Sequence, residues 1–134
     1  MAIPNQFESD VLPTSVGELT ITFLGHGSLW FVFNAQHIYV DPFSNVADYS
    51  KLPKADLVLI THEHSDHLDL PALAAVRTSH TQLILTEACA LQVQGGIVMH
   101  NGDVQQVKGI KIEVVPAYNL IHMRENGQPF HPKG

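Results

Sequence analysis

The chain has 134 residues, of which 45% are hydrophobic, and this is enough to bury one core of ordinary size. Its net charge of −6 and its seven scattered basic residues exclude broad binding to a nucleic-acid backbone, which needs clustered lysine and arginine. No apolar run approaches the length of a membrane span, and the N-terminus lacks the basic start and apolar centre of a signal peptide. We therefore expect a cytoplasmic protein of one domain, without nucleic acid or a membrane as partner.

The first part of the sequence predicts an antiparallel group of strands. Residues 1–17 are rich in turn-forming proline and glycine, and we expect them to form an irregular lead-in. Alternating or clustered apolar residues then predict strands at 19–24, 29–33 and 37–40. Residues 34–36 are the expected hairpin link between the last two of these strands.

The second part predicts strands that alternate with helices. Residues 55–60 form a short apolar run that is typical of a buried strand. A helix is expected over 70–77, with Asp69 as its cap and Pro71 in its first turn. Further strands are expected at 82–86, 96–99 and 110–115, and a second helix at 87–93. This order indicates an α/β fold.

The single cysteine of the chain, Cys89, excludes an intramolecular disulfide and fits a reducing compartment. It lies in the helix expected at 87–93. We therefore interpret it as a small buried hydrophobic residue rather than a nucleophile.

Four metal-competent side chains follow the strand expected at 55–60: His62, His64, Asp66 and His67. Imidazole nitrogen and carboxylate oxygen are the ligands that suit Zn²⁺. His62 and His64 are two positions apart, so an extended backbone would turn both rings to one face. Asp66 and His67 are adjacent and diverge unless the backbone turns, in which case they could serve a second ion. Two neighbouring ions are a common device for hydrolysis with activated water.

An adventitious interpretation of this cluster has to be weighed as well, because exposed histidine clusters bind metals without any catalytic role. The preceding apolar strand argues against it, since ligands at the carboxyl end of a core strand rest on a rigid base. Glu63 competes with Asp66 for the role of general base. By strand alternation, its side chain should point away from the ions.

The run His-x-His-x-Asp-His at 62–67 resembles the metal-binding signature of the metallo-β-lactamase fold hydrolases. Residues 24–28 and 40–43 resemble the opening motifs of that family, in the branch of L-ascorbate-6-phosphate lactonase-like proteins. Residues 115–119 followed by 131–134 resemble the segment that brings the third histidine ligand of the family.

The resemblance implies a partial αββα sandwich, in which this chain supplies an N-terminal sheet with its flanking helices. It assigns His62, His64 and His131 to a first metal ion, and Asp66 and His67 to a second. The implied cofactor is one or two Zn²⁺ ions, with Mn²⁺ or Fe²⁺ as alternatives. Asp66 is also the implied catalytic residue, because it can ligate a metal and orient or deprotonate the attacking water.

Two further residues have open roles. Asp41 matches a family carboxylate that supports the metal loop without binding an ion. The alternative interpretation, an Asp that precedes Pro in a turn at the end of a strand, fits nearly as well. His26 lies in a glycine-flanked turn. It either faces the mouth of the active site or is a solvated loop histidine.

The family pattern continues with a bridging Asp and a final His ligand that have no counterpart in these 134 residues. We therefore expect residues 1–134 to be the N-terminal part of a longer metallo-hydrolase domain. One hypothesis is an enzyme of which this chain is a fragment and whose activity requires the missing ligands. Such an enzyme would hydrolyse an ester, lactone or phosphoester bond in a small molecule, such as a lactone or a phosphorylated compound. The alternative is a non-catalytic metal-binding or assembly fragment. In that case its uncovered apolar face would pair with another copy, so we expect self-association if the chain is complete as given.

Overall fold

The structure is a computed structural model that describes residues 7–117, and a single large sheet dominates it. The chain divides into two compact units, Met1–Val98 and Met99–Gly134. The expectation of a single domain over 1–134 stays a prediction. The first unit contains seven strands: β1 (Glu8–Thr14), β2 (Gly17–Gly25), β3 (Ser28–Phe33), β4 (Gln36–Val40), β5 (Leu57–Leu59), β6 (Gln82–Leu85) and β7 (Ile97–Val98). Its helices are the 3-10 turn η1 (Tyr49–Lys51), α1 (Leu70–Val76) and α2 (Glu87–Ala90). The second unit contains the hairpin β8 (Val104–Val107) and β9 (Ile110–Glu113).

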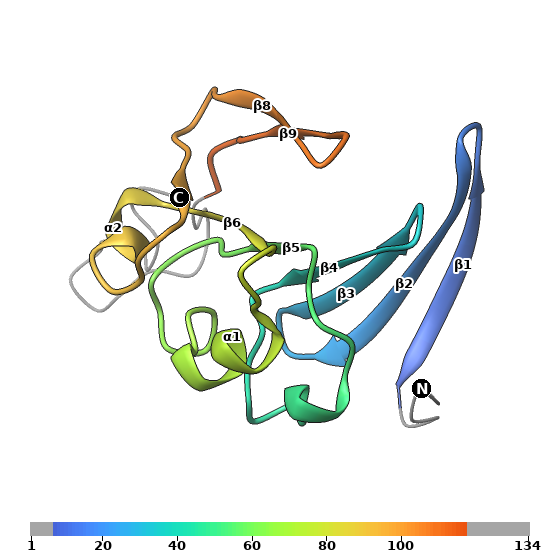
Figure 1. Cartoon of the computed structure of the whole chain (residues 1–134), viewed down its shortest axis with the longest axis horizontal. Coiled ribbons are helices and arrows are strands. Elements are labelled where there is room, and N and C mark those ends of the chain that lie inside the picture. Colours follow the sequence, from blue (N-terminus) through green and yellow to red (C-terminus); the bar gives the residue numbers. More distant parts are fainter. Residues whose placement is uncertain (1–6, 118–134) are drawn as a thin grey trace. The chain divides into compact units, whose positions relative to one another are not determined.

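The strands of the large sheet are arranged in the order in which they occur along the chain (Figure 1). From β1 to β4 neighbouring strands are antiparallel, as the sequence predicted for 19–40. From β4 to β7 they are parallel, which requires a crossover after each strand. The carboxyl ends of β4 and β5 therefore lie at one edge of the sheet, together with the turn between β2 and β3. This mixed α/β sheet confirms the predicted fold class.

The prediction of an irregular lead-in over residues 1–17 is wrong for residues 8–14. These residues form β1, which pairs with β2 along its whole length. Every residue of β1 is exposed, so no alternation of buried and exposed positions marks the strand in the sequence. Pro13 is tolerated because β1 is an edge strand, where a proline needs no partner for a backbone N–H.

The core lies on the face of the sheet that α1 and α2 cover. Trp30, Tyr39, Val58 and Leu83 are paired across four neighbouring strands, and each is at most 1% exposed. The helices contribute Ala72, Leu73 and Val76 from α1 and Cys89 from α2. Cys89 is fully buried, and burial raises the pKa of its thiol, as expected of a small hydrophobic residue rather than a nucleophile.

Helix α1 begins as predicted, with Asp69 as its cap and Pro71 in the first turn. The carboxylate of Asp69 accepts hydrogen bonds from the amides of Ala72, at 3.1 Å, and Ser44, at 2.8 Å. It therefore ties the loop after β4 to the start of α1. Although burial alone would raise the pKa of Asp69, these amides hold it below its ordinary value.

The other elements differ from the predictions mainly at their ends. Helix α2 stops at Ala90, short of the predicted end at residue 93. Strand β8 was not predicted at all, because two of its four residues are glutamine and its only buried residue is Val107. Among residues 7–117, no helix has both the length and the apolar character to cross a membrane.

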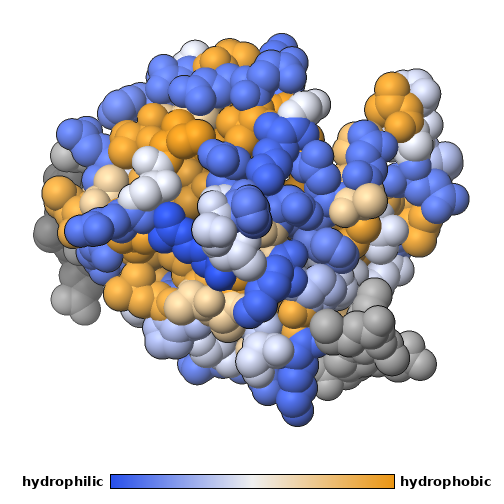
Figure 2. Space-filling view, in the orientation of Figure 1, coloured by the Kyte–Doolittle hydropathy of each residue, from blue (hydrophilic) through white to orange (hydrophobic). Residues whose placement is uncertain are grey.

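Apolar side chains are exposed over β1 and β2, on the side where the sheet ends (Figure 2). Val11, Leu12, Val16 and Phe23 are 45–69% exposed. An edge strand that carries such residues offers both unpaired backbone groups and apolar surface to another chain.

The turn between β3 and β4 contains a strained alanine. Asn34 and Ala35 have φ values of 50° and 61°, as in the two-residue hairpin turns that favour Asn-Gly. The left-handed conformation costs an alanine about 1–2 kcal/mol, partly offset by the entropy that glycine loses on folding. We expect Ala35→Gly to raise the free energy of unfolding by about 0.5–1 kcal/mol in urea denaturation. The control Ala74→Gly, on the exposed side of α1, should lower it by about 1 kcal/mol. A loss of stability in Ala35→Gly would contradict this account of the turn.

Candidate metal centre

The candidate site lies at the edge of the sheet where β4 and β5 end. Asp41 follows β4, and Thr61 and His62 come shortly after β5. Because β4 and β5 are parallel, these residues meet at one edge, as predicted for ligands at the carboxyl end of a core strand. Leu29 of β3 pairs with Val40 of β4, which brings the turn between β2 and β3 to the same edge.

The backbone of Asp41 is held in an unusual conformation. Its φ is 44°, in the left-handed region, and only 2% of the residue is exposed. Its amide donates to the carbonyl of Leu59 at 3.0 Å, and its carbonyl accepts from the buried hydroxyl of Ser28 at 2.6 Å. Strain of this kind persists where surrounding contacts impose it, and it is concentrated at functional sites.

This conformation turns the carboxylate of Asp41 toward the metal loop, residues 61–67. Oδ1 accepts from the amide of Thr61 at 2.8 Å, and Oδ2 accepts from the hydroxyl of Thr61 at 2.6 Å. Oδ2 also accepts from Nδ1 of His67 at 2.7 Å. Asp41 thus supports the loop, and a turn-forming aspartate before proline would not need these contacts.

Asp41 also fixes which ring nitrogens carry protons. A carboxylate only accepts, so in neutral His67 the proton is on Nδ1 and the lone pair is on Nε2. The hydroxyl of Thr61 donates its one proton to Asp41, so its 2.8 Å contact with Nδ1 of His62 must be donated by the ring. In both histidines the lone pair therefore lies on Nε2, the ring nitrogen that can bind a metal. This is the usual result of a carboxylate behind a metal-binding histidine.

A tight turn brings the four side chains of the motif together. The carbonyl of His64 accepts from the amides of His67, at 2.9 Å, and Leu68, at 2.8 Å. The ring centroid of His62 lies 4.7 Å from that of His64 and 4.0 Å from that of His67. The backbone turn that the sequence required for Asp66 and His67 to share a site is therefore present.

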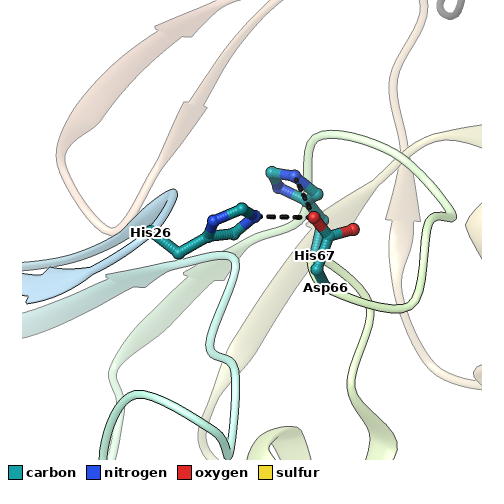
Figure 3. Close-up of side chains that lie close together, drawn as sticks. All are labelled: His26, Asp66 and His67. Carbon is teal, nitrogen blue, oxygen red and sulfur yellow. Dashed lines mark hydrogen bonds and ion pairs between the residues drawn. The ribbon is translucent and has the colours of Figure 1, made fainter.

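His26 reaches this loop from the turn between β2 and β3 (Figure 3). Its Nε2 lies 2.6 Å from Oδ2 of Asp66, and the same oxygen lies 3.5 Å from Nε2 of His67. The hydrogen bond from His26 holds the pKa of Asp66 below its ordinary value, although burial opposes this. Asp66 is therefore ionised at neutral pH. Of the two open roles for His26, the structure supports contact with the site.

Nε2 of His67 and Oδ2 of Asp66 are spaced as two ligands of one divalent cation. Two groups of side chains, His26–Asp66–His67 and Asp41–His62–His67, each have possible ligand atoms within 4.8 Å of one another. In each group one member, His26 or Asp41, is a hydrogen-bond partner of a possible ligand. Two ligands of a tetrahedral ion, each about 2.1 Å from it, are roughly 3.4 Å apart. The 3.5 Å between Nε2 of His67 and Oδ2 of Asp66 matches this separation. A nitrogen lone pair and a carboxylate that face each other at this distance form a suitable place for a cation.

The predicted ligands do not all fall into these two groups. His64 belongs to neither, although its ring lies beside that of His62. Glu63 is exposed, and the direction of its side chain relative to the ions stays a prediction. His131 lies outside the described residues. The assignment of ligands to a first and a second ion stays a prediction.

The sequence interpretation missed two residues of the site, Thr61 and Ser28. Thr61 had a recognisable position, directly between the buried strand and the first histidine. Ser28 lies in the segment 24–28, which resembles an opening motif of the family, but its contact with Asp41 depends on the strand order.

Comparisons with known proteins agree with this geometry. The family model described as a beta-lactamase superfamily domain matches residues 20–133. A UPF0173 metal-dependent hydrolase of Pelotomaculum thermopropionicum is 32% identical over 109 residues, which are 75% of this chain and 47% of that protein. Another, from Methanopyrus kandleri, is 33% identical over 119 residues, 82% of this chain and 51% of that protein. The chain thus spans about half the length of these relatives.

Solved structures show the same fold. A protein of Parabacteroides distasonis described as a metal-dependent hydrolase has a TM-score of 0.87 and 46% identity, covering 95% of this chain and 57% of that one. Igni18, a metallo hydrolase of Ignicoccus hospitalis, has a TM-score of 0.62 at 24% identity and supports the fold alone, covering 83% of this chain and 52% of that one. The predicted resemblance is therefore confirmed: the chain belongs to the beta-lactamase superfamily domain family and has a metallo-β-lactamase type of fold.

Proposed function

We propose that this chain carries the metal-binding part of a metal-dependent hydrolase. The observation that carries the proposal is the set of contacts made by Asp41. Directly and through Thr61, it places the ring lone pair of both His62 and His67 on Nε2, and Nε2 of His67 lies 3.5 Å from the carboxylate of Asp66. The family supports the same function, because the relatives named above are described as metal-dependent hydrolases.

His62, His64, Asp66 and His67 would hold one or two ions, with His131 as a further proposed ligand. Zn²⁺ is the proposed metal because histidine and carboxylate suit it best, with Mn²⁺ and Fe²⁺ as alternatives. A cation of this kind supplies a Lewis acid and lowers the pKa of a water molecule that binds to it.

The residues of the chain have separate roles in the proposed reaction. Asp66 is the catalytic residue: its carboxylate orients the attacking water and accepts the proton that the water loses. Asp41 and Thr61 keep the rings of His62 and His67 in one orientation and one tautomer. The bond that is cleaved is an ester, lactone or phosphoester.

The proposed substrate is a small molecule, including a lactone or a phosphorylated compound. An open hollow of about 550 Å³ adjoins the turn that carries His26. Phe7, Phe23 and Val46 line it together with Glu8, so it offers both apolar and polar contacts to such a molecule. The proposed location is the cytoplasm, which fits the single cysteine.

Metal analysis combined with a hydrolysis assay tests the proposal. The purified chain, loaded with Zn²⁺, would be incubated with a lactone, a carboxylic ester and a phosphodiester. We expect the chain to bind zinc, and we expect a chelator and Asp66→Asn to abolish any hydrolysis that it catalyses. A chain that binds no zinc would overturn the proposal.

The second candidate function is a non-catalytic metal-binding or assembly module. The exposed apolar residues on the edge strand β1 are the observation that favours pairing with another copy. Sedimentation of the same sample distinguishes a monomer from such an assembly.

A further inference from the structure

The turn between β2 and β3, residues 25–28, is shaped to lie against the metal loop. A Cβ atom at Gly27 would lie 2.9 Å from Cε1 of His67, so a glycine is needed for this close approach. The hydroxyl of Ser28 donates to the carbonyl of Asp41 at 2.6 Å. The turn therefore contacts both a predicted ligand and the carboxylate residue that supports the loop.

The backbone of this turn also determines where His26 points. His26 has a φ of 52°, in the left-handed region, and Gly25 before it has a φ of 123°. The imidazole lies with its centroid 5.6 Å from that of His67 and 5.9 Å from that of Phe43. A non-glycine residue held in this region is uncommon, and the conformation directs the ring to the metal loop.

The contact between His26 and Asp66 has a defined direction. A carboxylate only accepts, so Nε2 of His26 donates to Oδ2 at 2.6 Å. The bond links residues 40 positions apart, and Asp66 is otherwise on an exposed turn. Without this donor, the carboxylate could rotate away from Nε2 of His67, which lies 3.5 Å from the same oxygen.

We propose that His26 is a positioning residue, which holds the carboxylate of Asp66 beside Nε2 of His67 so that the two can bind one cation. This inference rests on the proposed function. The side chain of His26 is 51% exposed, so it contributes little to the stability of the fold. Its removal should therefore change the metal site and leave folding intact.

The test is cobalt and zinc binding to the whole chain and to three variants. Co²⁺ absorption reports the geometry of the ligands, and competition with a chelator gives the affinity for Zn²⁺. We expect His26→Ala to change the Co²⁺ spectrum and to weaken the affinity of the Asp66–His67 pair for zinc by about 10- to 100-fold. His26→Gln, whose amide can donate from a similar position, should restore most of the affinity. His80→Ala, at an exposed histidine outside the site, should behave like the unmodified chain.

Two outcomes would overturn the inference. Unchanged affinity and spectrum in His26→Ala would mean that Asp66 needs no support. A His26→Gln variant as weak as His26→Ala would mean that the imidazole itself is required, as a ligand rather than as a donor. If the unmodified chain binds neither Co²⁺ nor Zn²⁺, the proposed function is wrong, and the inference that rests on it is wrong as well. Equal thermal unfolding midpoints would show that all variants remain folded.

Discussion

Replacing His62 and His64 by alanine together is expected to remove the first metal ion from the chain. The two rings lie 4.7 Å apart, and each is a direct ligand in the proposed site. Loss of an outer partner of a metal ligand costs about 10- to 100-fold in affinity, so loss of two ligands should cost more. Zinc content measured after gel filtration should therefore fall by one ion per chain, and hydrolysis should fall with it.

The matched control replaces His80 and His100, two exposed histidines outside the motif, by alanine. This variant removes the same number of imidazoles and should keep its zinc. Circular dichroism would verify that both double variants are folded. Unchanged zinc content in His62→Ala/His64→Ala would remove these two residues from the site.

Asp41→Asn should weaken both the fold and the metal site. The two carboxylate oxygens accept three hydrogen bonds, from the amide and hydroxyl of Thr61 and from Nδ1 of His67. An asparagine amide has an NH₂ group in place of one carboxylate oxygen. In either orientation this group faces at least one of the three donors and cannot accept from it, so at least one hydrogen bond is lost. Because hydrogen bonds to a buried charged group contribute about 1.5–3 kcal/mol, we expect the free energy of unfolding to fall by about 2–3 kcal/mol.

The same substitution should lower the affinity for zinc by about 10- to 100-fold, since the rings of His62 and His67 lose their fixed orientation. Denaturation in urea and competition with a chelator measure the two effects. Asp48→Asn is the control, because it removes an exposed carboxylate that caps η1, where asparagine is equally suitable. If Asp41→Asn and Asp48→Asn have the same stability and affinity, Asp41 does not organise the site.

The sequence predicts those elements of the molecule that depend on residues close together in the chain. The apolar run before Thr61 predicts β5, and Asp69 with Pro71 predicts the start of α1. The dense motif from His62 to His67 predicts a cluster of possible ligands, because all its members lie within one turn. For the same reason the family resemblance is strongest there.

What the sequence does not predict depends on contacts between distant residues. The hydrogen bond from Thr61 to Asp41 spans 20 positions, and the one from His26 to Asp66 spans 40. These contacts exist because the strand order brings three chain segments to one edge of the sheet, and no local pattern records that order. Strand β1 was missed for a related reason. Its stability comes from pairing with β2, and no buried face marks it.

The most direct test of the account is a crystal structure of the chain soaked in zinc, with anomalous data collected at the zinc edge. We expect an anomalous peak about 2.1 Å from the ring nitrogens of His62 and His64, with His67 and Asp66 around the same ion or a neighbouring one. Asp41 should remain bonded to Nδ1 of His67 and should not touch the metal. Imidazoles of His62 and His64 that point apart, or zinc bound only elsewhere on the surface, would contradict the central claim.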